Sequence, residues 1–298
     1  MKTQSDATDF SDKLNIQGHI RPGLSIGLGI FDGLHKGHQS FLDKIDALLT
    51  FFPHPSSVLG KRQIDYLTLP HELRDLVEQE SKQLWIAEFT AELASLSPDA
   101  FLDTLKNVCH PQKIVVGYDF RFGSNRAGTT EHLSDWAKSN GIDTTILDPV
   151  INPDATPYKS SLARDFIRDG LLSDAIDIMG HPYPIYGTVI RGDGRGKALG
   201  VPTANIQVPP TKLIPAPGVY SGHAILPNGD QARAGIYIGS KPTFKGQSLS
   251  IEAHLLDQSI DLYDAPLKLF LETKIRDEKR FDSKEALIHQ IKIDLAVL

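Results

Sequence analysis

The pattern of secondary structure along the chain changes near residue 180, and this change constrains the fold more than any other feature. Before it, strand-like apolar runs alternate with helical patterns, as at 24–31 followed by 38–45 and 114–116 followed by 131–140. After it, short β-like runs follow one another between Gly, Pro and Asn. Strand–helix alternation predicts a parallel α/β sheet, whereas successive short strands predict an antiparallel barrel or sandwich.

The two patterns predict two domains in a chain of 298 residues. We place the boundary in the Pro-rich turn that follows an expected helix at 164–179, giving domains at 20–181 and 182–298. A last helix is expected from Asp282, because Asp282 and Glu285 form a capping-box pattern. Leu287 and Leu295 then fall on one face of that helix.

Composition limits the class of protein. The formal net charge of −6 argues against a broad basic surface for nucleic acid or membranes. No apolar run approaches the ~18 residues of a membrane-spanning helix, and residues 1–13 are unlike a signal peptide. We therefore expect a cytoplasmic protein that binds neither nucleic acid nor membrane. The single cysteine, Cys109, is expected to be a packed residue rather than a nucleophile.

A glycine-rich loop opens the second half of the chain. Glycines and basic residues alternate in it: Gly192, Gly194, Arg195, Gly196, Lys197 and Gly200. Such glycines let a ligand approach the backbone, whose N–H groups can form an anion-binding nest. Thr203 and Asn205 follow, and their neutral oxygens suit a hard cation such as Mg²⁺. The pattern is typical of a nucleotide-phosphate loop; a plain solvent loop is the alternative.

A second glycine-rich turn follows the expected strand at 24–31. It reads Phe31-Asp32-Gly33-Leu34-His35-Lys36-Gly37-His38. A turn from a parallel strand into a helix places free helix N–H groups where α/β sheets bind anionic ligands. His35 and His38 flank Gly37, so they can bracket a phosphate and stabilise developing charge. Two surface histidines at a helix start are the alternative.

Two further strand ends carry candidate ligands. The segment 117–123, which contains Asp119, follows the strand at 114–116, and Arg126 comes shortly after it. Its alternating Phe and Arg residues can stack on a ring and reach a phosphate, although a surface turn is the alternative. His54 follows the strand at 48–52 and is interpreted as a turn residue.

Glu252 lies in a strand-like run of the second half. Alternation places Ile251 and Ala253 on one face of the strand and Glu252 on the other. A carboxylate directed at the phosphate loop can take a proton from a substrate hydroxyl, although a solvated strand glutamate is the alternative. Arg276, Glu278 and Lys279 precede the last helix. Arg276 is a candidate ligand, and a plain charged loop of all three residues is the alternative.

Taken in order, these motifs resemble those of the bifunctional bacterial riboflavin kinase/FAD synthetase family. The segments 31–39, 50–55, 92–98 and 117–126 are similar to its adenylyltransferase module. The segments 192–205, 218–220, 239–244, 252–257 and 281–283 are similar to its kinase module. The match covers nearly the whole chain beyond residue 20 and keeps the order of the motifs.

The resemblance implies a Rossmann-like nucleotidyltransferase domain followed by an antiparallel β-barrel with a terminal helix. The barrel would transfer the γ-phosphoryl group of ATP to riboflavin, giving FMN, with Thr203 and Asn205 holding Mg-ATP and Glu252 as the base. The first domain would join FMN to the adenylyl group of a second ATP, giving FAD, with His35 and His38 stabilising the transition state. The nucleotide-binding residues that the resemblance implies are Phe31, Asp32, Gly33, Gly37, Asp119, Arg126, Ser161, Arg164, Arg276 and the 192–197 loop.

The chain departs from the family pattern mainly in its first half. Leu162 stands where the family has an arginine, Ile30 replaces a frequent asparagine, and the segment 40–49 is short. We therefore expect the first helix to be clipped to about two turns, or the next strand to be shortened. In the second half, Asp264 replaces a glycine, which predicts a local turn change.

Two other functions remain open from the sequence. One is a riboflavin kinase with a degenerate adenylyltransferase domain, and the other is a flavin- or nucleotide-binding protein without turnover. The partners in either case are small molecules: riboflavin, FMN and ATP.

Overall fold

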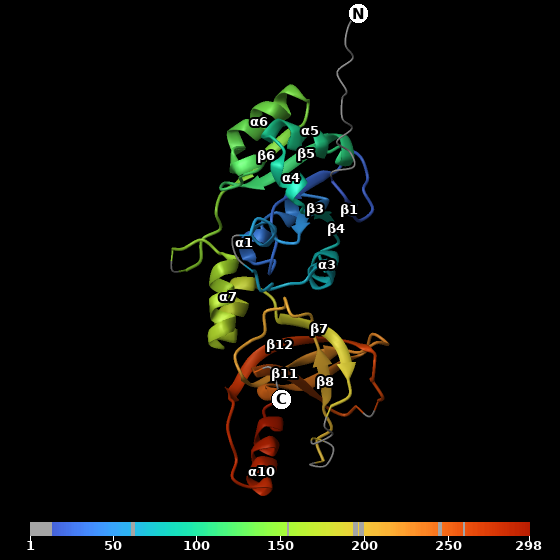
Figure 1. The fold of residues 1–298 in the computed structure, drawn as a ribbon, viewed down its shortest axis with the longest axis vertical. Helices are drawn as coiled ribbons and strands as arrows, with labels where there is room; N and C mark the ends of the chain where they lie inside the picture. Colours follow the sequence, from blue (N-terminus) through green and yellow to red (C-terminus); the bar gives the residue numbers. More distant parts are fainter. Residues whose placement is uncertain are drawn as a thin grey trace, which may run out of the picture. The chain divides into compact units, whose positions relative to one another are not determined.

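The computed structural model describes residues 14–60, 63–153, 155–192, 196, 200–243, 246–258 and 260–298. The chain forms two compact units. Unit 1 contains the chain up to Ile64 and the segment Leu73–Tyr158, and unit 2 contains Asp65–Glu72 and Lys159–Leu298. The expectation of an α/β part followed by an antiparallel barrel is confirmed (Figure 1).

Unit 1 is built on a six-stranded sheet in the order β1-β4-β3-β2-β5-β6. The strands are β1 Ile16–Gln17, β2 Ser25–Leu28, β3 Ala47–Phe52, β4 Gln83–Glu88, β5 Lys113–Gly117 and β6 Asp143–Leu147. Strands β2 to β6 are parallel, and β1 is antiparallel to β4. Their near-continuous apolar sequences fit a sheet that is buried on both faces.

Helices cover both faces of this sheet. They are α1 Lys36–Gln39, α2 Pro55–Val58, α3 Pro70–Gln79, α4 Ala91–Ser95, α5 Pro98–Cys109 and α6 Thr130–Ser139, with short 3₁₀ turns η2 Leu42–Lys44 and η3 Ser124–Arg126. Side chains of α5 and α6 form one core with β2 and β5. Leu73, Leu76 and Val77 of α3 join Leu48 of β3 in a second core on the other face.

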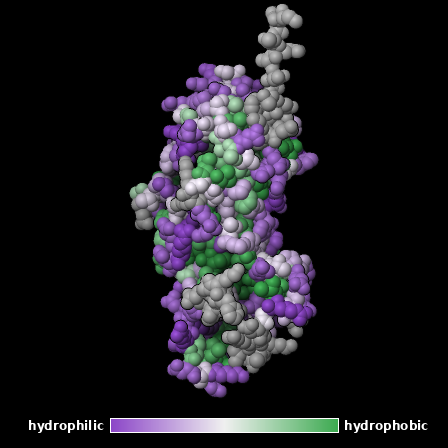
Figure 2. Space-filling view, viewed as in Figure 1, coloured by the Kyte–Doolittle hydropathy of each residue, from purple (hydrophilic) through white to green (hydrophobic). Residues whose placement is uncertain are grey.

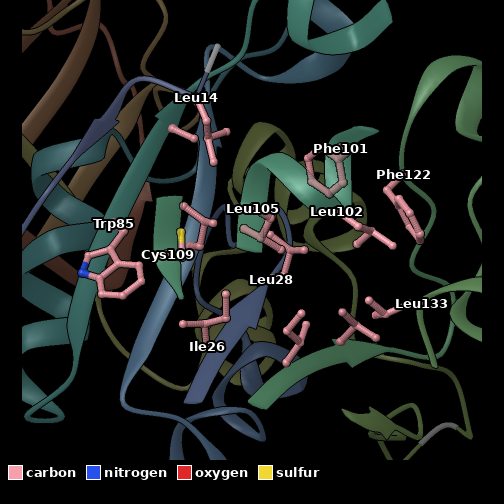
Figure 3. Close-up of a cluster of buried hydrophobic side chains, with 14 of the residues drawn as sticks. Leu14, Ile26, Leu28, Trp85, Phe101, Leu102, Leu105, Cys109, Phe122 and Leu133 are labelled. Carbon is pink, nitrogen blue, oxygen red and sulfur yellow. The ribbon is translucent and has the colours of Figure 1, made fainter. Parts of the chain in front are cut away.

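Figure 3 shows the first core, in which Phe101 and Leu105 of α5 gather with Ile26 and Leu28 of β2. Cys109 is fully buried in this core. Burial raises the pKa of its thiol to about 12, so the thiolate form is disfavoured. The expectation that Cys109 is a packed residue is confirmed.

Unit 2 contains a closed antiparallel barrel in the order β10-β11-β8-β7-β12-β9 (Figure 1). The strands are β7 Tyr183–Ile190, β8 Ala204–Gln207, β9 Gly218–Ile225, β10 Gln231–Thr243, β11 Gly246–Leu255 and β12 Pro266–Asp277. Closure leaves the barrel without the free edges of an open sheet. Ile251, Ala253 and Leu255 are buried, as strand alternation predicts.

Three helices accompany the barrel: α7 Ser160–Asp169, α8 Leu172–Met179 and α10 Lys284–Leu295. The single helix expected at 164–179 is wrong, because Gly170 adopts φ 73° and ends α7. The cap expected at Asp282 is also wrong. Ser283 is the N-cap of α10, and its Oγ accepts a hydrogen bond from the N–H of Ala286 at 3.1 Å.

The two compact units divide at other positions than the boundary expected at 181/182. Helices α7 and α8 belong to unit 2, and so does the segment Asp65–Glu72 from the first half of the chain. The domains 20–181 and 182–298 therefore do not coincide with the two packed units. They stay a prediction about which part of the chain carries each function.

Most of the molecular face in Figure 2 is hydrophilic, and apolar residues reach this surface in separate patches. Among the residues that the structure describes, no helix is long and apolar enough to cross a membrane.

Candidate active sites

The strand order of unit 1 places a topological switch point between β2 and β5. From β2 the chain continues to β3 and β4 on one side, and β5 and β6 lie on the other side. Ligands of open α/β sheets bind beyond the carboxyl ends of the strands at such a point. The turn containing His35 follows β2, and the segment containing Asp119 follows β5. The sequence motifs therefore lie at the edge where this fold class binds nucleotides.

His35 is the N-cap of α1 and is buried. The backbone N–H of His38 donates to His35 Nδ1 at 3.3 Å. A neutral His35 ring that accepts at Nδ1 carries its proton on Nε2, which makes Nε2 a donor. The rings of His35 and His38 stack with centroids 3.6 Å apart, so the structure brings the two predicted residues together.

Small and aromatic neighbours hold the two histidines in place. A Cβ at Gly37 would lie 3.0 Å from His35 Cε1, which is tighter than an ordinary contact. Phe31 packs edge-on against His38, with centroids 5.2 Å apart. Gly33 adopts φ 82°, a conformation that favours glycine, and Asp32 beside it is buried.

The segment after β5 is anchored to the start of α5. A Cβ at Gly123 would lie 2.8 Å from Pro98 Cα, and Ser124 N–H donates to the Leu96 carbonyl at 2.6 Å. This packing explains why the motif at 92–98 accompanies the motif at 117–126. Arg126 is exposed and adopts φ 59°, and Asp119 is also exposed. Their roles as nucleotide ligands stay predictions.

His54 repeats the capping geometry of His35 on the neighbouring strand. It is the N-cap of α2, and its Nδ1 accepts a hydrogen bond from Ser56 N–H at 3.0 Å. The interpretation of His54 as a turn residue agrees with this local role.

Ser161 and Arg164 lie on α7 and therefore in unit 2. Arg164 is buried, and its Nε donates to the Asp65 carbonyl at 3.2 Å. Arg168 pairs with the Asp65 carboxylate at 3.0 Å. In the structure Arg164 thus contacts the segment 65–72. Its nucleotide-binding role stays a prediction.

Glu252 lies on β11, between the neighbouring strands β8 and β10 of the barrel. Its register partners are Asn205 of β8 and Tyr237 of β10. The Thr203 hydroxyl donates to Glu252 Oε2 at 3.0 Å. The three residues singled out from the sequence as base and cation ligands therefore meet on one face of the barrel wall, although 49 positions separate Thr203 from Glu252.

Two glycines of the 192–200 loop lie against this group. A Cβ at Gly192 would collide with the Asn205 side chain, and one at Gly196 would lie 3.0 Å from Thr203 Oγ1. Glycine is therefore required for close approach at both positions. Gly194, Arg195 and Lys197 lie outside the described residues.

Arg276 is part of β12 rather than of a loop, and it binds the terminal helix. Its Nε donates to Asp294 Oδ1 and Oδ2 at 3.0 and 2.9 Å, and its Nη2 donates to Oδ2 at 2.8 Å. Asp294 is buried. The expected charged loop is therefore wrong for Arg276 but agrees with Glu278 and Lys279, which follow β12. The nucleotide-binding role of Arg276 stays a prediction.

Sequence reasoning missed Tyr237, and it placed Glu278 only in a charged loop without the contact between the two residues. The Tyr237 hydroxyl donates to Glu278 Oε1 at 2.6 Å. One signal was present: Tyr237 alternates with the buried Ile236 and Ile238, which puts it on the face opposite the barrel interior.

Comparisons with known proteins match both halves of the chain to described families. The FAD synthetase family model matches residues 18–161, and the riboflavin kinase family model matches residues 179–298. A Listeria monocytogenes protein named bifunctional riboflavin kinase/FMN adenylyltransferase is 35% identical, over 90% of this chain and 89% of its own. The chain belongs to this family. Proteins with the same name from Bacillus subtilis and Escherichia coli K12 are 33% and 30% identical, covering 90% and 94% of this chain and 89% and 93% of their own.

A solved structure from Streptococcus pneumoniae, named a macrolide-efflux protein, has the same fold as this family member. Its TM-score is 0.83 at 28% identity, and the similarity covers 96% of each chain.

Two of the four departures from the family pattern can be followed in the structure. After β2 the chain forms the four-residue helix α1 and the three-residue turn η2, and β3 has six residues. The first helix is therefore about one turn long, shorter than the two turns expected. Asp264 adopts φ 61°, the left-handed conformation that glycine adopts most readily. The local turn change expected there stays a prediction.

Proposed function

We propose that this chain converts riboflavin to FMN in unit 2 and FMN to FAD in unit 1, consuming one ATP in each step. The Thr203–Glu252 hydrogen bond beside two loop glycines is the observation that most supports the first reaction. The stacked His35 and His38 rings at the carboxyl edge of the sheet support the second.

In the kinase reaction, Glu252 takes the proton of the riboflavin 5′-hydroxyl as its oxygen bonds to the γ-phosphorus of ATP. The bond between the γ-phosphorus and the bridging oxygen breaks, and ADP leaves. The Thr203 hydroxyl holds Glu252 Oε2 in place at 3.0 Å. The glycine-rich sequence of this loop suits backbone N–H groups that bind the phosphates.

The residues beside Glu252 fit a magnesium ion. Mg²⁺ prefers hard oxygen ligands and is often held by few protein groups together with substrate phosphates. Thr203 Oγ1 donates its one proton to Glu252, which leaves its lone pairs for a cation, and the Asn205 side-chain oxygen is a second ligand of the same type. No cluster of three or more His, Cys, Asp or Glu suited to a metal is found among the described residues. Bound there, Mg²⁺ would neutralise phosphate charge.

In the adenylyltransferase reaction, an FMN phosphate oxygen bonds to the α-phosphorus of ATP, and pyrophosphate leaves with its bridging oxygen. No covalent protein intermediate is needed. His35 donates from Nε2, because its Nδ1 accepts the His38 N–H. Donors aimed at the α-phosphate oxygens stabilise the charge that develops there. The net charge of −6 supports small-molecule partners rather than nucleic acid or a membrane surface.

One assay separates this function from its alternatives. The protein is incubated with riboflavin, ATP and Mg²⁺, and riboflavin, FMN and FAD are resolved by chromatography. We expect both FMN and FAD. FMN without FAD would indicate a kinase with a degenerate adenylyltransferase unit, and no product would indicate a flavin-binding protein.

The variant Glu252→Gln assigns the two reactions to two sites. Glutamine still accepts the Thr203 hydrogen bond but is not a base, so FMN formation should fall by about 10²–10⁴-fold. Conversion of supplied FMN to FAD should stay at the wild-type rate. Loss of both reactions would contradict the two-site scheme.

A further inference from the structure

A second hydrogen-bonded pair lies beside Glu252, outside the roles proposed above. Tyr237 of β10 stands directly opposite Glu252 in the antiparallel register of β10 and β11. Its hydroxyl donates to Glu278 Oε1 at 2.6 Å, and Glu278 follows the last residue of β12. The bond therefore joins the strand next to Glu252 to the segment that leads into α10.

The ring of Tyr237 occupies space that is free because Gly239 has no side chain. Residues 237 and 239 face the same side of β10, because side chains alternate along a strand. A Cβ at Gly239 would collide with the Tyr237 hydroxyl. Glycine at position 239 is therefore what allows the ring of Tyr237 to lie along the strand.

Tyr237 is held in its protonated form. Burial raises the pKa of its hydroxyl above the usual value, and the hydrogen bond to Glu278 raises it further. A phenol that donates to a carboxylate makes a charge-assisted bond, which is stronger than a neutral one. The pair is therefore a fixed donor–acceptor contact at neutral pH.

Glu252 has a different neighbour on each side of its strand. Asn205 of β8 is its partner on one side, where Gly192 also lies, and Tyr237 of β10 is its partner on the other. In phosphoryl transfer the attacking and leaving oxygens lie roughly in line on opposite sides of the phosphorus. If the nucleotide lies on the β8 side, beside Gly192, an acceptor hydroxyl in line with the leaving oxygen lies on the β10 side of Glu252.

We propose that Tyr237 is a positioning residue for the phosphoryl acceptor, acting through Glu278. Its hydroxyl holds the Glu278 carboxylate on the acceptor side of Glu252, where the carboxylate accepts hydrogen bonds from hydroxyls of the polyol chain. This inference rests on the proposed kinase function. A carboxylate has two oxygens, so Glu278 can bind the substrate while it accepts from Tyr237. The three bonds between Arg276 and Asp294 fix the end of β12, from which Glu278 follows.

The test is steady-state kinase kinetics of the full chain with Tyr237→Phe. This change removes the hydroxyl and keeps the ring, so the KM for riboflavin should rise about tenfold, as expected for a lost bond to a charged group. We expect kcat, the KM for ATP and the thermal unfolding midpoint to stay at wild-type values. Tyr263→Phe is the matched control, because Tyr263 is an exposed tyrosine in the turn before β12, and it should change none of these constants.

A double-mutant cycle separates positioning from simple packing. Tyr237→Phe should add nothing to the KM for riboflavin in a Glu278→Ala background, because the hydroxyl acts only through that carboxylate. Equal effects of Tyr237→Phe in both backgrounds would overturn the proposal. So would an unchanged KM for riboflavin, an equal rise in the KM for ATP, or a fall in kcat together with the unfolding midpoint.

The outcomes also distinguish this inference from the function on which it rests. If the wild-type protein makes no FMN, both the kinase function and the role of Tyr237 are wrong. A wild-type protein that makes FMN, with a Tyr237→Phe variant of identical kinetics, would remove only the role of Tyr237.

Discussion

At the scale of single residues, the same histidine geometry follows two neighbouring parallel strands. His35 caps α1 after β2, and His54 caps α2 after β3, each with Nδ1 accepting a backbone N–H. A capping histidine has a fixed tautomer, because the accepting nitrogen cannot carry the proton of a neutral ring. The cap that starts a helix therefore also sets which ring nitrogen is a donor.

Gly37→Ala tests this arrangement in unit 1. The new Cβ would lie 3.0 Å from His35 Cε1, so the imidazole must shift away from its present position. We expect FAD formation from supplied FMN to fall about tenfold or more, since small misplacements of positioned groups can cost up to ~10²-fold. Alanine is a better helix former than glycine by about 1 kcal/mol, so stability should not fall.

The kinase reaction of the same Gly37→Ala protein is the internal control, and riboflavin phosphorylation should keep its wild-type rate. If the Gly37→Ala protein forms FAD at the wild-type rate, the position of His35 does not matter for adenylyl transfer.

At the scale of elements, a buried ion pair fixes the segment Asp65–Glu72 in unit 2. Lys212 Nζ lies 2.7 Å from Glu72 Oε2, and both side chains are fully buried. Lys212 also donates to the Leu67 carbonyl at 2.6 Å. Glu72 accepts from the N–H groups of Leu69 and Tyr186 at 2.7 and 2.9 Å. Both charges are therefore paired and hydrogen-bonded, as burial requires.

Lys212→Met should destabilise unit 2 strongly. It leaves the Glu72 carboxylate buried without its counter-ion, a loss worth about 3–5 kcal/mol. Both tryptophans lie in unit 1, at positions 85 and 136, so their fluorescence does not report on unit 2. Hydrogen exchange of the β7 amides is the appropriate measurement.

The double variant Lys212→Met/Glu72→Gln is the matched control for that loss. A neutral glutamine removes the unpaired buried charge, and its single side-chain oxygen can still accept from either Leu69 or Tyr186. Part of the lost stability should therefore return. A single variant that costs less than about 1 kcal/mol, the value of an exposed pair, would contradict the assignment of a buried pair.

At the scale of the whole molecule, the chain passes between its compact units more than once. It enters unit 2 after Ile64, returns to unit 1 at Leu73, and enters unit 2 again after Tyr158. The match to the riboflavin kinase family begins only at residue 179. Packing of unit 2 thus includes α7, α8 and the segment 65–72, which lie outside the matched range.

A fragment of residues 179–298 should lose most of the effect of the Lys212 substitution. The fragment contains Lys212 but lacks the whole segment 65–72, so the ammonium group loses both its carboxylate and the backbone that covers it. Lys212→Met should therefore change the stability of the fragment by less than about 1 kcal/mol, the value of an exposed pair, whereas it destabilises the full chain. Urea unfolding followed by far-UV circular dichroism compares the two fragments, and a loss as large as in the full chain would contradict the role of the segment 65–72.

The sequence determined the elements and faces whose signals are local. Periodicity placed the strands at 48–52 and 114–116, and alternation put Glu252 opposite the buried face of β11. Turn chemistry located the glycine-rich turn that follows β2. The helix break at Gly170 and the cap at Ser283 were missed, because several residues there compete as stop or start signals and packing decides between them.

Only the tertiary structure decided which distant residues meet. The Thr203–Glu252 bond depends on the register of β8 against β11, and the Glu72–Lys212 pair joins residues 140 positions apart. No local propensity encodes such contacts, since they follow from strand pairing and from burial of the whole core. The sequence by itself therefore determined the chemistry of the two sites, and the closed barrel and the parallel sheet decided the geometry in which that chemistry is assembled.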